Sequence, residues 1–146
     1  MSRYLILVLL GPNLNMLGRR GYAHYGGQTL QDIRHKVYER GAALGLEIDF
    51  RQSNYEGELV TWIQDALDKV DGIVINAAAY THTSIAVHDA LELHDVPIVE
   101  VHHSEPKQRE SFRHFSYIEP LADRIITGMK GDGYLDALDY LAGKNG

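Results

Sequence analysis

The 146-residue chain contains no cysteine, which excludes a disulfide framework, a thiolate metal site and a cysteine nucleophile. It also lacks long apolar runs. The first such run, Leu5–Leu10, is too short to span a membrane, and no signal-type cleavage site follows it. We therefore expect a cytoplasmic protein that has no membrane partner.

Positive charge is scarce, since the formal net charge is −6. A nucleic-acid partner is therefore not expected. The arginines are nevertheless unevenly placed, with Arg19 and Arg20 in one irregular stretch and Arg109 and Arg113 in another. A guanidinium group matches a carboxylate, so these arginines could hold a small anion. Solvated surface charge is the alternative for any one of them.

Several catalytic signatures are missing. The chain has no G-x-G-x-x-G, no P-loop, no G-x-S-x-G and no H-E-x-x-H, and none of its five lysines ends a predicted strand. The sequence therefore favours neither nucleotide binding nor a Schiff base. We also expect no catalytic metal and no cofactor.

Apolar, β-branched runs alternate with helical patterns, which predicts parallel strands joined by right-handed crossovers. We expect one domain over residues 1–146. Its fold class is α/β, with a flavodoxin-like three-layer arrangement and a five-stranded parallel sheet of order 2-1-3-4-5. Thr29 and Asn54 are the expected caps of the first two helices. The predicted strands are 4–10, 46–52, 72–76, 96–102 and 124–127, and the predicted helices are 29–44, 56–70, 84–93 and 134–141.

Polar side chains follow three of these strands. The first strand runs into Gly11-Pro12-Asn13-Leu14-Asn15, the third ends at Asn76, and the fourth ends at His102 with Glu100 two residues earlier. Ligands of open α/β sheets bind beyond the carboxyl ends of the strands. Because residues i and i+2 of a strand share a face, Glu100 can orient His102 as a general acid. A buried acid satisfied by backbone donors is the other interpretation of Glu100.

A long irregular stretch, residues 11–28, is rich in glycine and is typical of a functional or mobile loop. It predicts an active-site lid around residues 19–27, which contains Tyr25. A tyrosine base must lose its phenolic proton, and lowering its pKa by ~2 requires roughly 3 kcal/mol. One guanidinium about 4 Å away supplies roughly 4 kcal/mol at an effective dielectric near 20. Many loop tyrosines, however, only pack against their surroundings.

Together these residues resemble the type II 3-dehydroquinate dehydratase (type II dehydroquinase) family. The matching stretches recur in order along nearly the whole chain, and the ordered set is far more specific than any one of them. They are residues 11–18, Tyr25-Gly26, 51–54, Glu56-Gly57, Asn76, Thr81-His82-Thr83-Ser84, 100–104, 109–114 and Gly133-Tyr134.

The resemblance implies reversible dehydration of 3-dehydroquinate to 3-dehydroshikimate, a lyase reaction without metal or cofactor that serves the shikimate pathway or quinate catabolism. Tyr25 would be the base that forms an enolate, and Arg20 would lower its pKa. Asn13 would hold the water that stabilises the enolate oxygen. His102, supported by Glu100, would protonate the departing hydroxyl group.

Other positions are implied to bind the substrate. Asn76, Ser104 and the backbone amide of His103 would fix the carboxylate and a nearby hydroxyl group. His82 and Arg113 would hold ring hydroxyls.

The resemblance also reaches beyond the residues around the ring. Arg109 would add positive field near the lid. Asp89 would reach the site of a neighbouring subunit, which implies a dodecamer built from trimers.

The lid departs from the family pattern, with Arg20-Gly21-Tyr22 where Arg-Glu-Pro is usual. Tyr22 and Arg19 are the alternatives to Tyr25 and Arg20. His103 and Glu105 also differ from the usual residues. A flavodoxin-like module that binds a small carboxylate without turnover is the second hypothesis, since such sheets host many functions.

Overall fold

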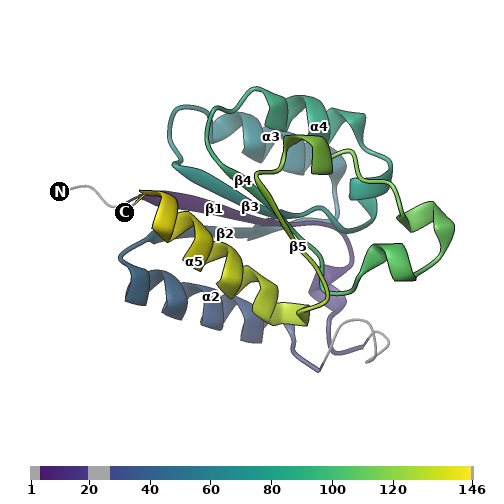
Figure 1. The fold of residues 1–146 in the computed structure, drawn as a ribbon, viewed down its shortest axis with the longest axis horizontal. Coiled ribbons are helices and arrows are strands. Elements are labelled where there is room, and N and C mark those ends of the chain that lie inside the picture. The colour runs from purple at the N-terminus through teal and green to yellow at the C-terminus, as the bar shows by residue number, and fades with distance from the viewer. Residues whose placement is uncertain (1–3, 20–26, 146) are drawn as a thin grey trace.

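A five-stranded, fully parallel sheet forms the centre of the protein. A computed structural model describes residues 4–19 and 27–145. The strand order, β2-β1-β3-β4-β5, confirms the predicted flavodoxin-like topology (Figure 1). The strands are β1 Leu5–Leu10, β2 Glu47–Gln52, β3 Gly72–Asn76, β4 Ile98–Val101 and β5 Arg124–Ile126.

Helices cover both faces of this sheet. Those on one face are α2 (Leu30–Leu44) and α5 (Gly133–Asn145), and those on the other are α3 (Glu56–Asp65) and α4 (Ile85–Glu92) (Figure 1). Short 3-10 turns occupy the connections, at Leu14–Met16, Ala78–His82, Pro106–Gln108, Ser111–Arg113, Glu119–Leu121 and Lys130–Asp132. Among the described residues, no helix is both long and apolar enough to cross a membrane.

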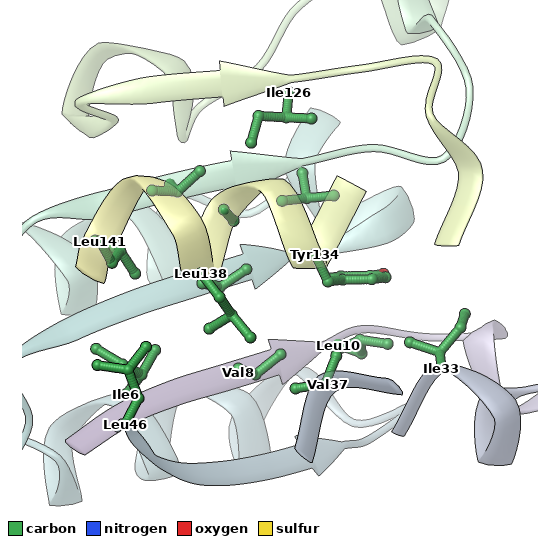
Figure 2. Packing of buried hydrophobic residues seen from close by; sticks show 14 of the residues in the cluster. Ile6, Val8, Leu10, Ile33, Val37, Leu46, Ile126, Tyr134, Leu138 and Leu141 are labelled. Carbon is green, nitrogen blue, oxygen red and sulfur yellow. The ribbon is translucent and has the colours of Figure 1, made fainter. Parts of the chain in front are cut away.

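Each face of the sheet has its own apolar core because strand side chains alternate between the faces. From β1, Ile6 and Val8 point to the cluster beneath α2 and α5, whereas Leu7 and Leu9 point to the cluster beneath α3 and α4. Figure 2 shows the first cluster, which includes Tyr134 of α5. All of these strand side chains are buried, so the sheet is a rigid platform for its carboxyl ends.

Helix α2 has the ends that its sequence predicts. The Thr29 side chain accepts from the backbone N–H of Asp32, and the Asp32 side chain accepts from that of Thr29, so the two form a capping box. Gly45 ends the helix with a left-handed φ of 74°.

Helix α3 begins at the predicted residue, Glu56, but differs from the prediction in its cap and in its last residue. Its N-cap is Tyr55 rather than Asn54, and the Asn54 side chain instead accepts from the backbone N–H of Asn13 at 3.0 Å. Tertiary contact with the loop after β1 thus outcompetes local capping. The helix stops at Asp65 rather than near residue 70, and Asp68 shortly afterwards has a φ of 63°. Helix α5, in contrast, runs four residues further than the predicted end at residue 141.

The carboxyl ends of β1 and β3 are joined directly. The backbone N–H of Gly11 donates to the Asn76 carbonyl at 2.8 Å. A Cβ atom at position 11 would lie 2.4 Å from the Ala77 carbonyl oxygen, so only glycine fits there. This approach brings Asn13 beside Asn76. At the amino-terminal ends of the strands, on the side away from these carboxyl ends, β1 begins close to where α5 ends (Figure 1).

Candidate active site

A pocket of about 140 Å³ lies at the carboxyl ends of β1, β3 and β4. We call it the strand-end pocket. Its walls come from the segments that follow these three central strands, which are the positions at which open α/β sheets bind ligands. Its lining residues are Pro12, Asn13, Leu14, Asn76, Ala78, Ala79, His82, His102, His103, Ser104, Pro106, Arg109 and Arg113.

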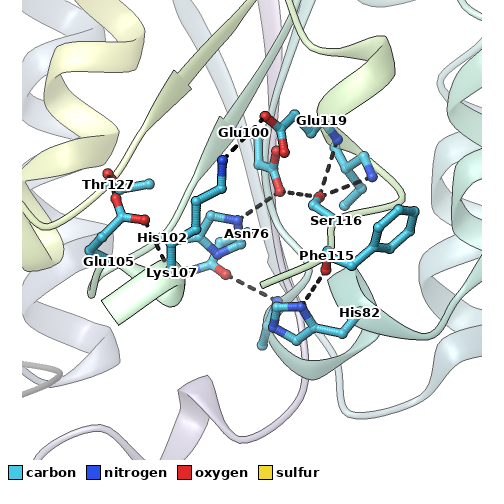
Figure 3. Close-up of polar contacts among 12 residues, drawn as sticks. Asn76, His82, Glu100, His102, Glu105, Lys107, Phe115, Ser116, Glu119 and Thr127 are labelled. Carbon is cyan, nitrogen blue, oxygen red and sulfur yellow. Dashed lines mark hydrogen bonds and ion pairs between the residues drawn. The ribbon is translucent and has the colours of Figure 1, made fainter. Parts of the chain in front are cut away.

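His102 and Glu100 form a buried pair at the end of β4. The Nε2 atom of His102 lies 2.7 Å from Oε2 of Glu100, and the Ser116 hydroxyl donates to the same oxygen at 2.6 Å (Figure 3). Glu100 is 1% exposed. Because the carboxylate engages Nε2, only Nδ1 of His102 can face a ligand in the pocket. The arrangement fixes the orientation of the imidazole ring.

Asn76 is held by its own carboxamide. Its Oδ1 atom accepts from the backbone N–H of Ala78 at 3.0 Å, and its Nδ2 atom donates to the Tyr134 hydroxyl at 3.0 Å. A backbone N–H can only donate, so the oxygen and nitrogen positions are unambiguous. One N–H of the carboxamide therefore stays available to the pocket.

His82 enters the pocket from the turn after β3. Its Nδ1 atom lies 2.7 Å from the Phe115 carbonyl oxygen, which can only accept, so Nδ1 carries a proton (Figure 3). Partial burial lowers the pKa of His82 below its usual value, and the positive charges of His102 and Arg113 act in the same direction. His82 is therefore neutral at pH 7, and its Nε2 atom is an acceptor.

Two arginines supply positive charge at the rim. Arg109 donates to the Ser104 hydroxyl at 3.3 Å, and Nε of Arg113 lies 3.0 Å from the Glu110 carboxylate. Glu110 also lies 3.8 Å from Arg109. Its pKa is lowered, chiefly by a backbone hydrogen bond and also by Arg113. An anion in the pocket would thus lie near two guanidinium groups.

The segment after β4 is tied to β5. The Thr127 hydroxyl donates to the Glu105 carboxylate, which also accepts from the backbone N–H of Lys107 at 3.1 Å. The hydrogen bond from Thr127 is the main reason why the pKa of Glu105 is lowered. This contact fixes the chain directly after Ser104.

Comparison of the sequence with known proteins identifies the family of this chain. The family model described as "Dehydroquinase class II" matches residues 4–142. The chain belongs to the class II dehydroquinase family. It is 54% identical over 140 residues to a 3-dehydroquinate dehydratase of Mesorhizobium japonicum, covering 95% of this chain and 97% of that protein. It is also 50% identical to 3-dehydroquinate dehydratase 2 of Pseudomonas putida, covering 94% and 93% of the two chains.

Solved structures agree as well. The crystal structure of type II dehydroquinase from Propionibacterium acnes has a TM-score of 0.92 and 41% sequence identity. It covers 97% of this chain and 99% of that one. The family expected from the sequence motifs is therefore confirmed.

Most residues predicted for the site of this class II dehydroquinase do meet there. Eight line the strand-end pocket, and Glu100 lies directly behind His102. Tyr25 and Arg20 lie outside the described residues, as does most of the expected lid. Asp89 is on the exposed side of α4 and does not line the pocket of its own chain. The eight lining residues are Asn13, Asn76, His82, His102, His103, Ser104, Arg109 and Arg113.

One further group could hold a metal, away from the pocket. Ligand atoms of His88, Asp89 and Glu92 on α4 lie within 4.8 Å of one another. The Nδ1 atom of His88 lies 2.6 Å from the Tyr117 carbonyl oxygen. Exposed acidic groups often gather in this way without an ion.

Two polar residues that were not predicted for the site, Ser116 and Tyr134, hydrogen-bond to residues of the site. Ser116 follows no predicted strand and has no motif of its own, so its bond to Glu100 depends on tertiary structure. Tyr134 belonged to a matching stretch and to the last predicted helix, but it was given no role in the site. Its hydroxyl group bonds both Asn76 and His103.

Proposed function

We propose that this class II dehydroquinase catalyses the reversible dehydration of 3-dehydroquinate to 3-dehydroshikimate through an enolate. The observation that carries the proposal is the His102–Glu100 pair, with 2.7 Å between Nε2 and Oε2, at the wall of a pocket that also presents Asn76, His82 and Arg113. A carboxylate-supported imidazole suits proton donation to a leaving hydroxyl group. Family membership and relatives that are 3-dehydroquinate dehydratases support the same reaction.

His102 is the proposed general acid. Its Nδ1 atom, the ring nitrogen not engaged by Glu100, gives a proton to the C1 hydroxyl as the C–O bond breaks. Glu100 stabilises the imidazolium before this transfer, and Ser116 holds Glu100 in place. Because the pair is buried, its charges interact more strongly than they would in water.

Tyr25 is the proposed base. It removes a proton from C2, next to the C3 ketone, and the electron pair moves onto the ketone oxygen to give the enolate. Arg20 stabilises the tyrosinate, and Asn13 holds the water that bonds the enolate oxygen. The left-handed backbone of Asn13, with a φ of 70°, and its bond to Asn54 support a fixed position for this residue.

Asn76, Ser104 and the backbone amide of His103 bind the substrate carboxylate and an adjacent hydroxyl group. His82 accepts a hydrogen bond from a ring hydroxyl through Nε2, and Arg113 donates to another. Donors thus surround the carboxylate, whereas a neutral imidazole faces a hydroxyl group.

Arg109 adds positive field near the lid, which is the proposed element over residues 19–27. We further propose a trimer-based dodecamer in which Asp89 reaches the site of a neighbouring subunit. No metal or cofactor takes part in this reaction. The reaction serves the shikimate pathway or quinate catabolism.

The test is the ultraviolet absorbance of purified protein mixed with 3-dehydroquinate, with and without chelator. The product is a conjugated enone and the substrate is not, so absorbance rises if the proposal is correct. Tyr25→Phe and His102→Ala should abolish the rise without loss of fold, and chelator should not affect it. No rise with folded wild-type protein refutes the dehydratase, and full activity of Tyr25→Phe refutes the assigned base.

A further inference from the structure

A chain of buried hydrogen bonds runs from the pocket into the core through Asn76, Tyr134 and His103. The Tyr134 hydroxyl lies 3.0 Å from Nδ2 of Asn76 and 2.7 Å from Nε2 of His103. The three residues are 3%, 0% and 3% exposed. Tyr134 does not line the strand-end pocket, and Figure 2 shows its ring among the apolar side chains beneath α5.

The backbone of Ala78 fixes the direction of the bond between Asn76 and Tyr134. The backbone N–H of Ala78 donates to Oδ1 of Asn76, so Nδ2 faces Tyr134 and donates to its oxygen. The one proton of the Tyr134 hydroxyl can then be donated to Nε2 of His103, which accepts it in the tautomer that carries its proton on Nδ1. Burial raises the pKa of Tyr134 above its usual value, so this proton stays in place.

The packing of the two rings supports the same arrangement. The rings of His103 and Tyr134 meet edge to face, with centroids 5.3 Å apart and planes at 80°. Such contacts restrain both rings in addition to the hydrogen bond. The core thus orients the hydroxyl group, and the hydroxyl group orients the carboxamide.

We propose that Tyr134 is a positioning residue that acts through Asn76, and that the His103 side chain fixes the direction of the Tyr134 hydroxyl. This inference rests on the proposed function, because it assumes that Asn76 binds the substrate. The Ala78 N–H places the oxygen of the carboxamide, and Tyr134 anchors its nitrogen, so that Asn76 presents an N–H donor to the pocket, which suits a carboxylate and not a cation. His103 then acts through its side chain as well as through its backbone amide.

Binding of quinate tests this role separately from turnover. Quinate carries the carboxylate and ring hydroxyls but lacks the C3 ketone, so it cannot form the enolate. In Tyr134→Phe the carboxamide keeps its bond from the Ala78 N–H but loses the partner of Nδ2, so it is held less firmly and quinate binding by calorimetry should weaken roughly tenfold. With 3-dehydroquinate, KM should rise more than kcat falls, because Asn76 holds the ligand before and during reaction.

Tyr140→Phe is the matched control. Tyr140 lies on the same helix, ~9 Å further along its axis, and also loses only a hydroxyl group. It should bind quinate like the wild type. A Tyr134→Phe protein that also does so would overturn the proposal, as would a loss confined to kcat.

His103→Leu tests the second link and covers the case in which Tyr134→Phe fails to fold. Alone it should weaken quinate binding by about threefold, since a neutral hydrogen bond is lost. Added to Tyr134→Phe it should have no further effect, because the hydroxyl that it orients is already gone. Unchanged binding in His103→Leu, or additive losses in the double variant, would refute the proposed role of the His103 side chain.

The wild-type protein separates this inference from the proposed reaction. If it binds quinate but does not turn over 3-dehydroquinate, only the proposed reaction is refuted. If it binds no quinate, the positioning role of Tyr134 is refuted as well.

Discussion

Ser116→Ala should lower the free energy of unfolding by more than a substitution at a half-buried serine normally does. The substitution removes the 2.6 Å hydrogen bond to Glu100, whose other carboxylate oxygen has no hydrogen-bond partner among the described residues. The buried carboxylate would then keep only His102. A hydrogen bond to a charged group contributes ~1.5–3 kcal/mol. Ser116 also accepts from the backbone N–H groups of Ile118 and Glu119, each at 3.1 Å, and losing such a cap costs about 1 kcal/mol.

The sum, about 2.5–4 kcal/mol, corresponds to a fall in Tm of roughly 7–12 °C for a chain of this size. Thermal unfolding should be measured at one protein concentration, because the Tm of an assembling protein depends on it. Ser111→Ala, at an exposed serine of the same segment, is the control and should leave Tm nearly unchanged. In a Glu100→Gln background the cost of Ser116→Ala should shrink, since the bond there is neutral. A full cost in that background, or a fall below ~2 °C in the wild type, would refute the reasoning.

Three further outcomes follow from the structure. The pKa of Glu105 is lowered in the folded state, so its bond to Thr127 adds stability above the unfolded pKa and loses it as pH falls through the folded pKa. Thr127→Val should therefore lower Tm at pH 7 but not in strong acid. Gly11→Ala should prevent folding or lower Tm by more than ~10 °C, because the new Cβ atom would collide with the backbone of Ala77. A Cβ atom at Gly57 meets no other atom, so Gly57→Ala should raise the free energy of unfolding by ~0.5–1 kcal/mol. The KM of the wild type should rise as pH falls through the lowered pKa of His82, and His82→Gln should abolish that rise.

The layout of the sheet could be predicted because its strands are buried on both faces. Strand β3 begins and ends at the expected residues, Gly72 and Asn76, since a short β-branched run between turn residues leaves little choice. The first residue of α3 was predicted, but its cap and its last residue were not. Asn54 is a good cap by residue type, but it bonds the backbone of Asn13, 41 positions away in sequence. Local propensity does not encode such a contact.

The pocket could be predicted from the polar residues that follow strands, because parallel strands place their carboxyl ends at one edge. The supporting contacts could not. Ser116 lies in the connection between β4 and β5, which has no periodic pattern. Only the folded chain brings its hydroxyl group next to Glu100 of β4. Tyr134 belongs to the apolar face of α5, and only the structure reveals that its hydroxyl group bonds Asn76. Periodicity identifies the buried face of a helix but not the polar atom at the end of a buried ring.

The side of the sheet away from the strand-end pocket suits this protein to attachment. Strand β1 begins and α5 ends at the edge of the sheet opposite the strand-end pocket (Figure 1). Leu5 therefore lies about one strand length, ~17–20 Å, from the pocket mouth. A group attached to an exposed side chain on that side of the sheet should leave an open route for a small acidic ligand.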